Sequence, residues 1–282
     1  MTPSSNTDLA DPPSSILHPP SSILRFALAA AWFGVVFLLT RWAAPGIPVS
    51  GDVAVLGTTL LLIIATAPLE YVGGKLALLS TWHWVALGVV GALAFGANLL
   101  FTRLAVPGPA SLGLFIFAIA AGVLLGRYAL LDRDLLLLVV VLYIIIDAYS
   151  VFFGPTQVII RQGGPLLTIL TIRFPILGTA RVASLVGATD FLVWAACLQA
   201  AYRFGFPYRP SFAALTLGLL ASGVVSLVSD RAVPALPLMM LFYILVNRRS
   251  FSWRNRQLWA LAVGLLIVVL GIGALTRWWL LR

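Results

Sequence analysis

Charged residues are scarce in this chain, and their scarcity excludes an ordinary water-soluble globular protein. Only 10% of its 282 residues are charged, whereas a soluble domain carries about 25%. Hydrophobic residues make up 61% of the chain, which leaves too little polar surface to keep a globule dissolved. We therefore predict an all-α polytopic membrane protein whose exterior faces lipid.

Lysine, cysteine and histidine are also rare. Lys75 is the only lysine, so the net charge of +9 comes from arginines at the ends of apolar runs. This distribution argues against nucleic-acid binding and favours contact with a lipid bilayer. Cys197 has no partner for an intrachain disulfide, and His18 and His83 cannot form a metal site between them. We expect neither a metal nor another cofactor.

Nine apolar runs are candidates for membrane spans, since a span needs about 20 apolar residues. The predicted spans cover residues 24–43, 53–71, 84–103, 110–127, 134–154, 180–202, 211–229, 234–247 and 257–280. Residues 1–22 are rich in proline and serine and contain PPSSIL twice, so we predict a disordered tail there. The rest, 23–282, is predicted to be a single transmembrane domain.

One stretch, residues 161–179, does not follow the helical pattern. It opens with Gly-Gly-Pro and contains a second proline, Pro175. Within it, residues 166–172 are apolar and rich in β-branched side chains, which predicts a short strand. Backbone that is neither helix nor barrel is tolerated at membrane depth only against protein or a water-filled cavity. We therefore expect this segment to border a cavity.

Two aspartates, Asp147 and Asp190, lie inside apolar runs, whereas the other seven acidic residues lie in the tail or at span edges. A carboxyl group at mid-span costs about 2.5–3.5 kcal/mol, so each is a candidate functional residue. The alternative is a protonated acid that only joins two helices. At a rise of about 1.5 Å per residue, Asp147 lies about 20 Å from Asp134 and Asp190 about 13 Å from Arg181. The two spans then bring the carboxyl groups to a similar depth.

Paired carboxyl groups have a specific chemistry in a medium of low dielectric. Both cannot ionise, so the pair shares one proton. In an aspartyl protease, one carboxylate takes a proton from water while the other carboxyl group protonates the scissile carbonyl. Tyr143 shares a helical face with Asp147, and Gly187 leaves space beside Asp190. These residues predict a catalytic pair formed by Asp147 and Asp190.

Three short motifs accompany the two aspartates. They are D-A-Y-S-V-F beginning at Asp147, G-A-T-D-F ending just after Asp190, and P-A-L-P at 234–237. In this order they resemble the motifs of the presenilin and signal peptide peptidase family, and in particular its prokaryotic-type homologues. The resemblance covers residues 134–247 and implies an intramembrane aspartyl protease with Asp147 and Asp190 as its catalytic residues. Its substrates would be transmembrane proteins or peptides.

The same resemblance implies a substrate-binding set. By similarity, residues 161–179 would hold substrate as an extended strand, and the prolines of the P-A-L-P segment would leave carbonyl groups free to pair with an unwound substrate. The implied substrate-binding residues are Pro234, Ala235, Leu236, Pro237, Tyr143, Gly187, Thr189, Ile169 and Thr171.

The chain departs from the family pattern at three points. Ile146 stands where the family usually has tyrosine, Thr189 replaces the second glycine of G-x-G-D, and the predicted number of spans differs. Two alternatives therefore stay open. One is a proteolytically weak or inactive relative that binds transmembrane segments. The other is a proton- or cation-coupled transporter that uses the same carboxylates.

Basic residues give an expectation for the orientation in the membrane. Four arginines fall within residues 248–256, which favours a cytoplasmic loop there by the positive-inside rule. The loop at 155–179 would then lie on the outer side. We expect a multi-pass protein of a prokaryotic inner membrane, and the residues do not say whether it needs partner subunits.

Overall fold

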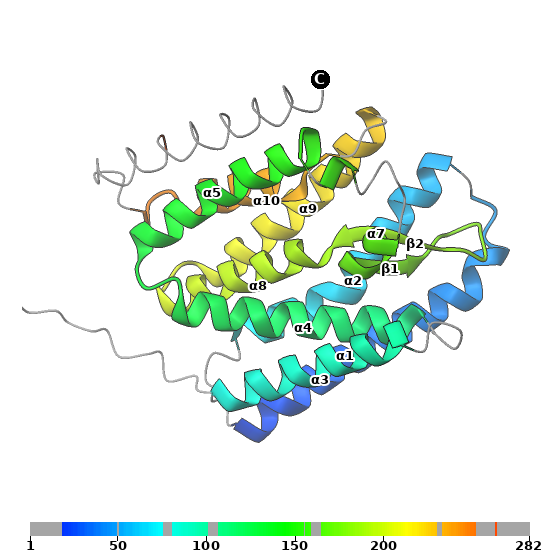
Figure 1. Ribbon diagram of the computed structural model, residues 1–282, viewed down its shortest axis with the longest axis horizontal. Coiled ribbons are helices and arrows are strands. Elements are labelled where there is room, and N and C mark those ends of the chain that lie inside the picture. The colour runs from blue at the N-terminus through cyan, green and yellow to red at the C-terminus, as the bar shows by residue number, and fades with distance from the viewer. Residues whose placement is uncertain are drawn as a thin grey trace, which may run out of the picture.

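Helices dominate the structure, a computed structural model of the chain (Figure 1). It describes residues 19–49, 51–75, 81–100, 107–154, 156–158, 165–229, 233–251 and residue 263. The helices are α1 (Pro19–Ala43), the 3-10 turn η1 (Ala44–Gly46), α2 (Gly51–Lys75), α3 (Thr81–Leu100), α4 (Pro107–Tyr128), α5 (Arg133–Phe152), α7 (Pro165–Leu170), α8 (Ala188–Arg203), α9 (Tyr208–Ser229) and α10 (Ala235–Asn247). The strands are β1 (Thr171–Pro175) and β2 (Val182–Gly187).

Five of these helices, α1, α2, α4, α5 and α9, are long and apolar enough to cross a membrane. They support the predicted helical membrane protein. The nine predicted spans are not confirmed, because the described part of the chain holds eight longer helices and a small two-stranded sheet. The ninth predicted span, 257–280, lies outside the described residues except for Val263, which is helical.

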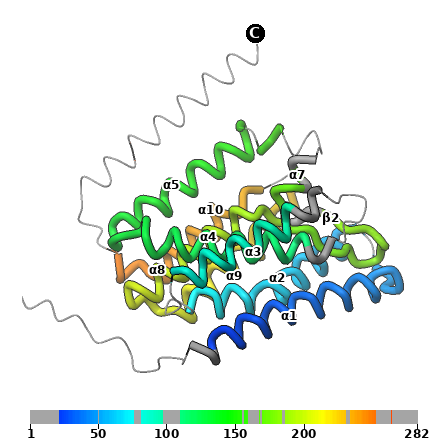
Figure 2. Tube along the Cα trace, turned by 60° about the horizontal axis from the view of Figure 1, so that its bottom comes forward, coloured from blue at the N-terminus to red at the C-terminus, as the bar shows by residue number. Residues whose placement is uncertain are grey.

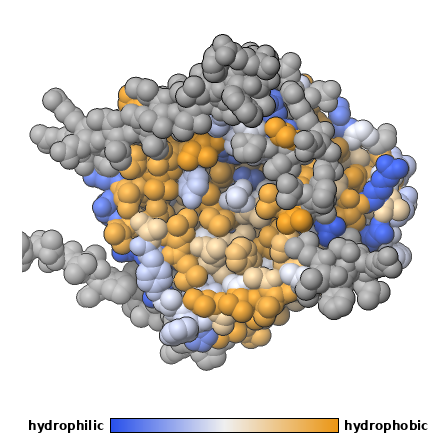
Figure 3. All heavy atoms as spheres, viewed as in Figure 1, coloured by the Kyte–Doolittle hydropathy of each residue, from blue (hydrophilic) through white to orange (hydrophobic). Residues whose placement is uncertain are grey.

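The exterior of the molecule carries many large apolar side chains. Apolar residues cover much of the face seen in Figure 3. On α1, for example, Leu28, Leu38 and Leu39 are each about three-fifths exposed, at 61%, 64% and 59%. Hydrophobic side chains exposed along a whole helix would be costly in water, so these surfaces fit a lipid environment.

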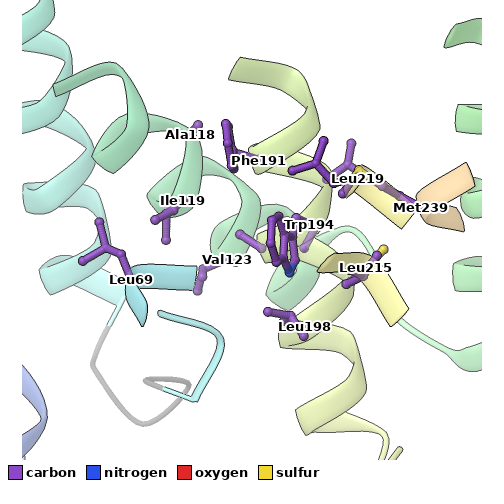
Figure 4. Close-up of a cluster of buried hydrophobic side chains, with 14 of the residues drawn as sticks. Leu69, Ala118, Ile119, Val123, Phe191, Trp194, Leu198, Leu215, Leu219 and Met239 are labelled. Carbon is purple, nitrogen blue, oxygen red and sulfur yellow. The ribbon is translucent and has the colours of Figure 1, made fainter. Parts of the chain in front are cut away.

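α8 forms the buried centre of the helix bundle. Every residue from Val193 to Ala201 is buried. A Cβ atom added to Gly126 of α4 would lie 2.7 Å from the Ala196 carbonyl oxygen, so α4 and α8 pack backbone against backbone. Figure 4 shows Trp194 of α8 among apolar side chains from neighbouring helices. The outer edge of the bundle is different: α5 lies there and packs along α10 (Figure 2).

A proline inside α2 is matched by a side chain of α1. Pro68 has no N–H, so it cannot bond the carbonyl group of Ile64 one turn earlier. The indole N–H of Trp32 donates a hydrogen bond to that carbonyl oxygen over 3.0 Å. The hydrogen bond that the proline removes is thereby replaced from the neighbouring helix.

The predicted strand at 166–172 is wrong in its placement. Residues 165–170 form α7, and the strand β1 begins only at Thr171, where it pairs with β2 in an antiparallel hairpin. Proline is favoured in the first turn of a helix, which explains why Pro165 opens α7. A register shift lies between Ile172 and Arg173 of β1.

The turn of the hairpin is held by α2 and by η1, which follows α1. The N–H of Leu177 donates to the Thr58 hydroxyl over 3.0 Å, and that of Gly178 donates to the Ala44 carbonyl group over 2.9 Å. Gly178 has a positive φ of 74°, which favours glycine. These contacts fix the hairpin at one end of the bundle.

The predicted span 180–202 is wrong in its first part. Residues 182–187 form β2, and α8 begins at Ala188 with 16 residues, or about 24 Å of helix. This is shorter than the roughly 30 Å of a hydrocarbon core. Asp190 therefore lies in the first turn of α8 and not in the middle of a spanning helix.

The first helix begins earlier than predicted. α1 starts at Pro19, so residues 19–22 of the predicted tail are helical. A proline in the first turn removes no helical hydrogen bond, because the first N–H groups of a helix have no partner within it. Residues 1–18 of the predicted tail lie outside the described residues.

Candidate active site

Asp147 connects α5 to the beginning of α10. Its Oδ2 atom accepts a hydrogen bond from the backbone N–H of Leu236 over 3.1 Å. The first N–H groups of a helix need a partner, and Pro234, the residue that precedes α10, has no side-chain acceptor to offer. The carboxyl group of Asp147 supplies one from another helix. This contact joins the first aspartate to the P-A-L-P segment.

Asp190 holds the beginning of its own helix. Its Oδ2 atom accepts the N–H of Gly187 over 3.1 Å, as the third residue of a helix does in half of a capping box. Gly187 is extended, with φ −66° and ψ 143°, and is the last residue of β2. The hairpin therefore leads directly into the turn that carries Asp190.

The two aspartates lie within electrostatic range of each other. Both side chains are half-buried, and the charge of Asp147 acts on the carboxyl group of Asp190. Each Oδ2 atom accepts one backbone N–H. Within the described residues, neither Oδ1 atom accepts or donates a hydrogen bond, so each carboxyl group has one oxygen without a protein partner there.

Comparisons with known proteins identify no relative. No family model, no curated protein and no solved structure matches the chain. The case for a function therefore rests on the motifs and on the arrangement of these residues.

All but one of the remaining predicted site residues fall into two groups. The first group is near Asp147. Tyr143 lies one helical turn before it on α5 and is half-buried. At the start of α10, Ala235 and Pro237 are half-buried, and Pro234 and Leu236 are buried. Near Asp190, Thr171 pairs with Gly187 across the hairpin, and Thr189 is exposed in the first turn of α8. Ile169 lies in α7. The prediction that it belongs to an extended strand is therefore wrong.

The two strands of the hairpin differ in their free edges. On β1, the Ser111 hydroxyl of α4 donates to the Arg173 carbonyl oxygen over 3.0 Å, and the Arg173 N–H lies 3.1 Å from the same hydroxyl oxygen. Pro175, at the end of β1, has no N–H. The outer edge of β1 is thus occupied, whereas no strand within the described residues pairs with the outer edge of β2.

The sequence did not predict the contact of Ser111 with the hairpin or the complete burial of Glu70. Ser111 is a single hydroxyl in an apolar helix, and nothing in the sequence around it indicates a strand partner. Glu70 was assigned to a span edge, yet it is fully buried, and neither carboxylate oxygen has a hydrogen-bond partner within the described residues. The predicted span ends at residue 71, whereas α2 continues to Lys75, which is why Glu70 was placed at an edge.

Proposed function

We propose that this chain is an intramembrane aspartyl protease that hydrolyses peptide bonds within transmembrane segments of other membrane proteins. One observation carries the proposal: the Asp147 carboxyl group accepts the N–H of Leu236 in the P-A-L-P segment, and its charge acts on Asp190 of another helix. Of the three motifs that resemble the presenilin and signal peptide peptidase family, the first contacts the third, and the aspartate of the first acts electrostatically on that of the second.

The chemistry follows from two carboxyl groups that share a proton. The ionised carboxylate takes a proton from a water molecule, and the resulting hydroxide attacks the scissile carbonyl carbon. The protonated carboxyl group gives its proton to the carbonyl oxygen. The C–N bond of the tetrahedral intermediate then breaks as a proton passes to the leaving nitrogen. The free Oδ1 atoms of Asp147 and Asp190 would carry these transfers.

The substrate must expose a peptide bond, so its helix must unwind locally. An extended segment can add as a strand to a free sheet edge, where its backbone groups find hydrogen-bond partners. The outer edge of β2 is the edge that suits this role, since Ser111 occupies that of β1. A segment paired with β2 would approach Asp190, which follows this strand by three residues.

We further propose a prokaryotic inner-membrane location with the hairpin on the outer side. The basic termini support this orientation, because Lys75, Arg127, Arg203 and Arg248 lie at the ends of α2, α4, α8 and α10. The hairpin turn contacts the opposite end of α2, near Thr58.

The proposal is tested by incubating the purified protein in liposomes with a synthetic transmembrane peptide and identifying products by mass spectrometry. We expect cleavage at a bond inside the apolar segment of the peptide. Peptide binding without products would instead support the inactive binder, and proton or cation flux without cleavage would support the transporter. Either result would overturn the proposed protease.

A further inference from the structure

A cluster of cations and aromatic rings lies where α2 ends and α9 begins. The ammonium group of Lys75 donates to the Tyr71 hydroxyl over 2.8 Å and lies 4.4 Å from the centre of that ring. It is also 5.2 Å from the Tyr208 ring. Arg209 is exposed and follows Tyr208 in the first turn of α9, where the Tyr208 ring lies 5.4 Å from the Tyr71 ring. Two cationic residues, one from each helix, thus lie at the same pair of aromatic rings.

Within the described part of the chain, no carboxylate forms an ion pair with Lys75 or Arg209. The nearest acidic residue in sequence, Glu70, is fully buried and makes no described hydrogen bond. Cations brought together repel each other, so an anion that bridges them would be favoured.

Apolar stripes lead away from this cluster along both helices. At 3.6 residues per turn, Lys75, Tyr71, Ile64 and Leu60 fall within an arc of about 60° on α2, and the two apolar residues are 50% and 41% exposed. On α9, Leu217 and Val224 lie on the same side as Arg209 and are 57% and 43% exposed. The two helices pack against each other. The surface thus combines a cationic end with an apolar length, as a phospholipid combines an anionic head with acyl chains.

We propose that Lys75 and Arg209 bind the phosphate group of an anionic phospholipid whose acyl chains follow the exposed stripes of α2 and α9. Tyr71 and Tyr208 form the aromatic floor of this site and suit the boundary between headgroups and hydrocarbon. The site is separate from Asp147 and Asp190, and the inference does not depend on proteolysis.

The test uses the full chain, purified in detergent and stripped of lipid. Phosphatidylglycerol, phosphatidylcholine or inorganic phosphate is added, and bound lipid is counted by native mass spectrometry. We expect phosphatidylglycerol to bind in preference to phosphatidylcholine. The double variant Lys75→Gln/Arg209→Gln should weaken phosphatidylglycerol binding roughly thirtyfold, because each basic residue contributes roughly fivefold. Excess inorganic phosphate should not displace the lipid.

A matched control removes the same charge elsewhere. Arg25→Gln/Arg249→Gln changes two exposed arginines and should keep binding within threefold of the wild type. Equal loss in both double variants would show general attraction to a basic protein and would overturn the site. Unchanged binding in the Lys75/Arg209 variant, or displacement by phosphate alone, would overturn it as well. If the double variant does not fold, the single variants decide, each with a roughly fivefold expected loss.

Discussion

The carboxyl group of Asp147 accepts the N–H of Leu236 from a position 89 residues earlier in the chain. A candidate catalytic group therefore also acts as the cap of α10. Its two oxygens differ: Oδ2 accepts a hydrogen bond from the first turn of α10, whereas Oδ1 has no hydrogen-bond partner among the described residues. This division allows the structural and the chemical role of Asp147 to be separated by substitution.

Asp147→Asn and Asp147→Ala should differ in stability but agree in activity. The asparagine side chain keeps an oxygen that can accept the Leu236 N–H, so its unfolding temperature in detergent should stay close to that of the wild type. Alanine leaves that N–H without a partner and should cost about 1 kcal/mol. Both variants should lose cleavage. Equal stability of the two variants would contradict the capping role.

Gly187 and Thr189 both precede Asp190 by no more than three residues and should respond differently to substitution. A Cβ atom at Gly187 would lie 3.2 Å from the Asp190 Oδ2 atom, so Gly187→Ala should shift this carboxyl group and reduce cleavage at least tenfold. Thr189 is exposed, so Thr189→Gly should change the cleavage rate less than threefold. Initial rates on one peptide provide the comparison. A larger effect at Thr189 than at Gly187 would contradict the geometry.

Ser111 should stabilise the hairpin from α4. Ser111→Ala removes the hydroxyl that contacts both the N–H and the carbonyl group of Arg173, which should cost about 1–2 kcal/mol of unfolding free energy. Ser222→Ala is the matched control, because Ser222 is also buried but bonds only Leu219 in its own helix. Thermal unfolding should separate the two variants, and similar losses would argue against the hairpin contact.

Trp32 and Pro68 should be coupled energetically. Trp32→Phe leaves the Ile64 carbonyl group without its indole donor and should cost about 1 kcal/mol. Pro68→Ala restores a backbone donor to the same carbonyl group, so the tryptophan substitution should cost less in that background. A double-mutant cycle on unfolding free energies measures this coupling. Strict additivity would show that the two residues act independently.

The helical membrane architecture could be predicted from the sequence, because it follows from the low share of charged residues and from the length of the apolar runs. It also pointed to Asp147, Asp190 and the segment 234–237, since isolated acids in apolar runs are conspicuous. The structure brings Asp147 into contact with that segment and into electrostatic range of Asp190.

The placement of the hairpin could not be predicted, because short apolar runs read equally well as strand or helix. Residues 166–172 were predicted to be a strand, but 165–170 form α7; residues 182–187 were predicted to start a span and form β2. The choice was made by tertiary contacts, including those of Ser111 with Arg173 and of Thr58 with Leu177. The sequence around these hydroxyl groups contains no pattern that predicts their hydrogen-bond partners.

The most direct test of the proposed protease compares Asp147→Asn and Asp190→Asn with the wild type. Both variants remove an ionisable group and keep a hydrogen-bond acceptor. The control is Asp52→Asn, which changes an exposed carboxyl group near the start of α2. Cleavage of a transmembrane peptide in liposomes should fall on the order of 10²–10⁴-fold in the Asp147 and Asp190 variants and persist in the control. Cleavage that survives in either the Asp147 or the Asp190 variant would contradict the account.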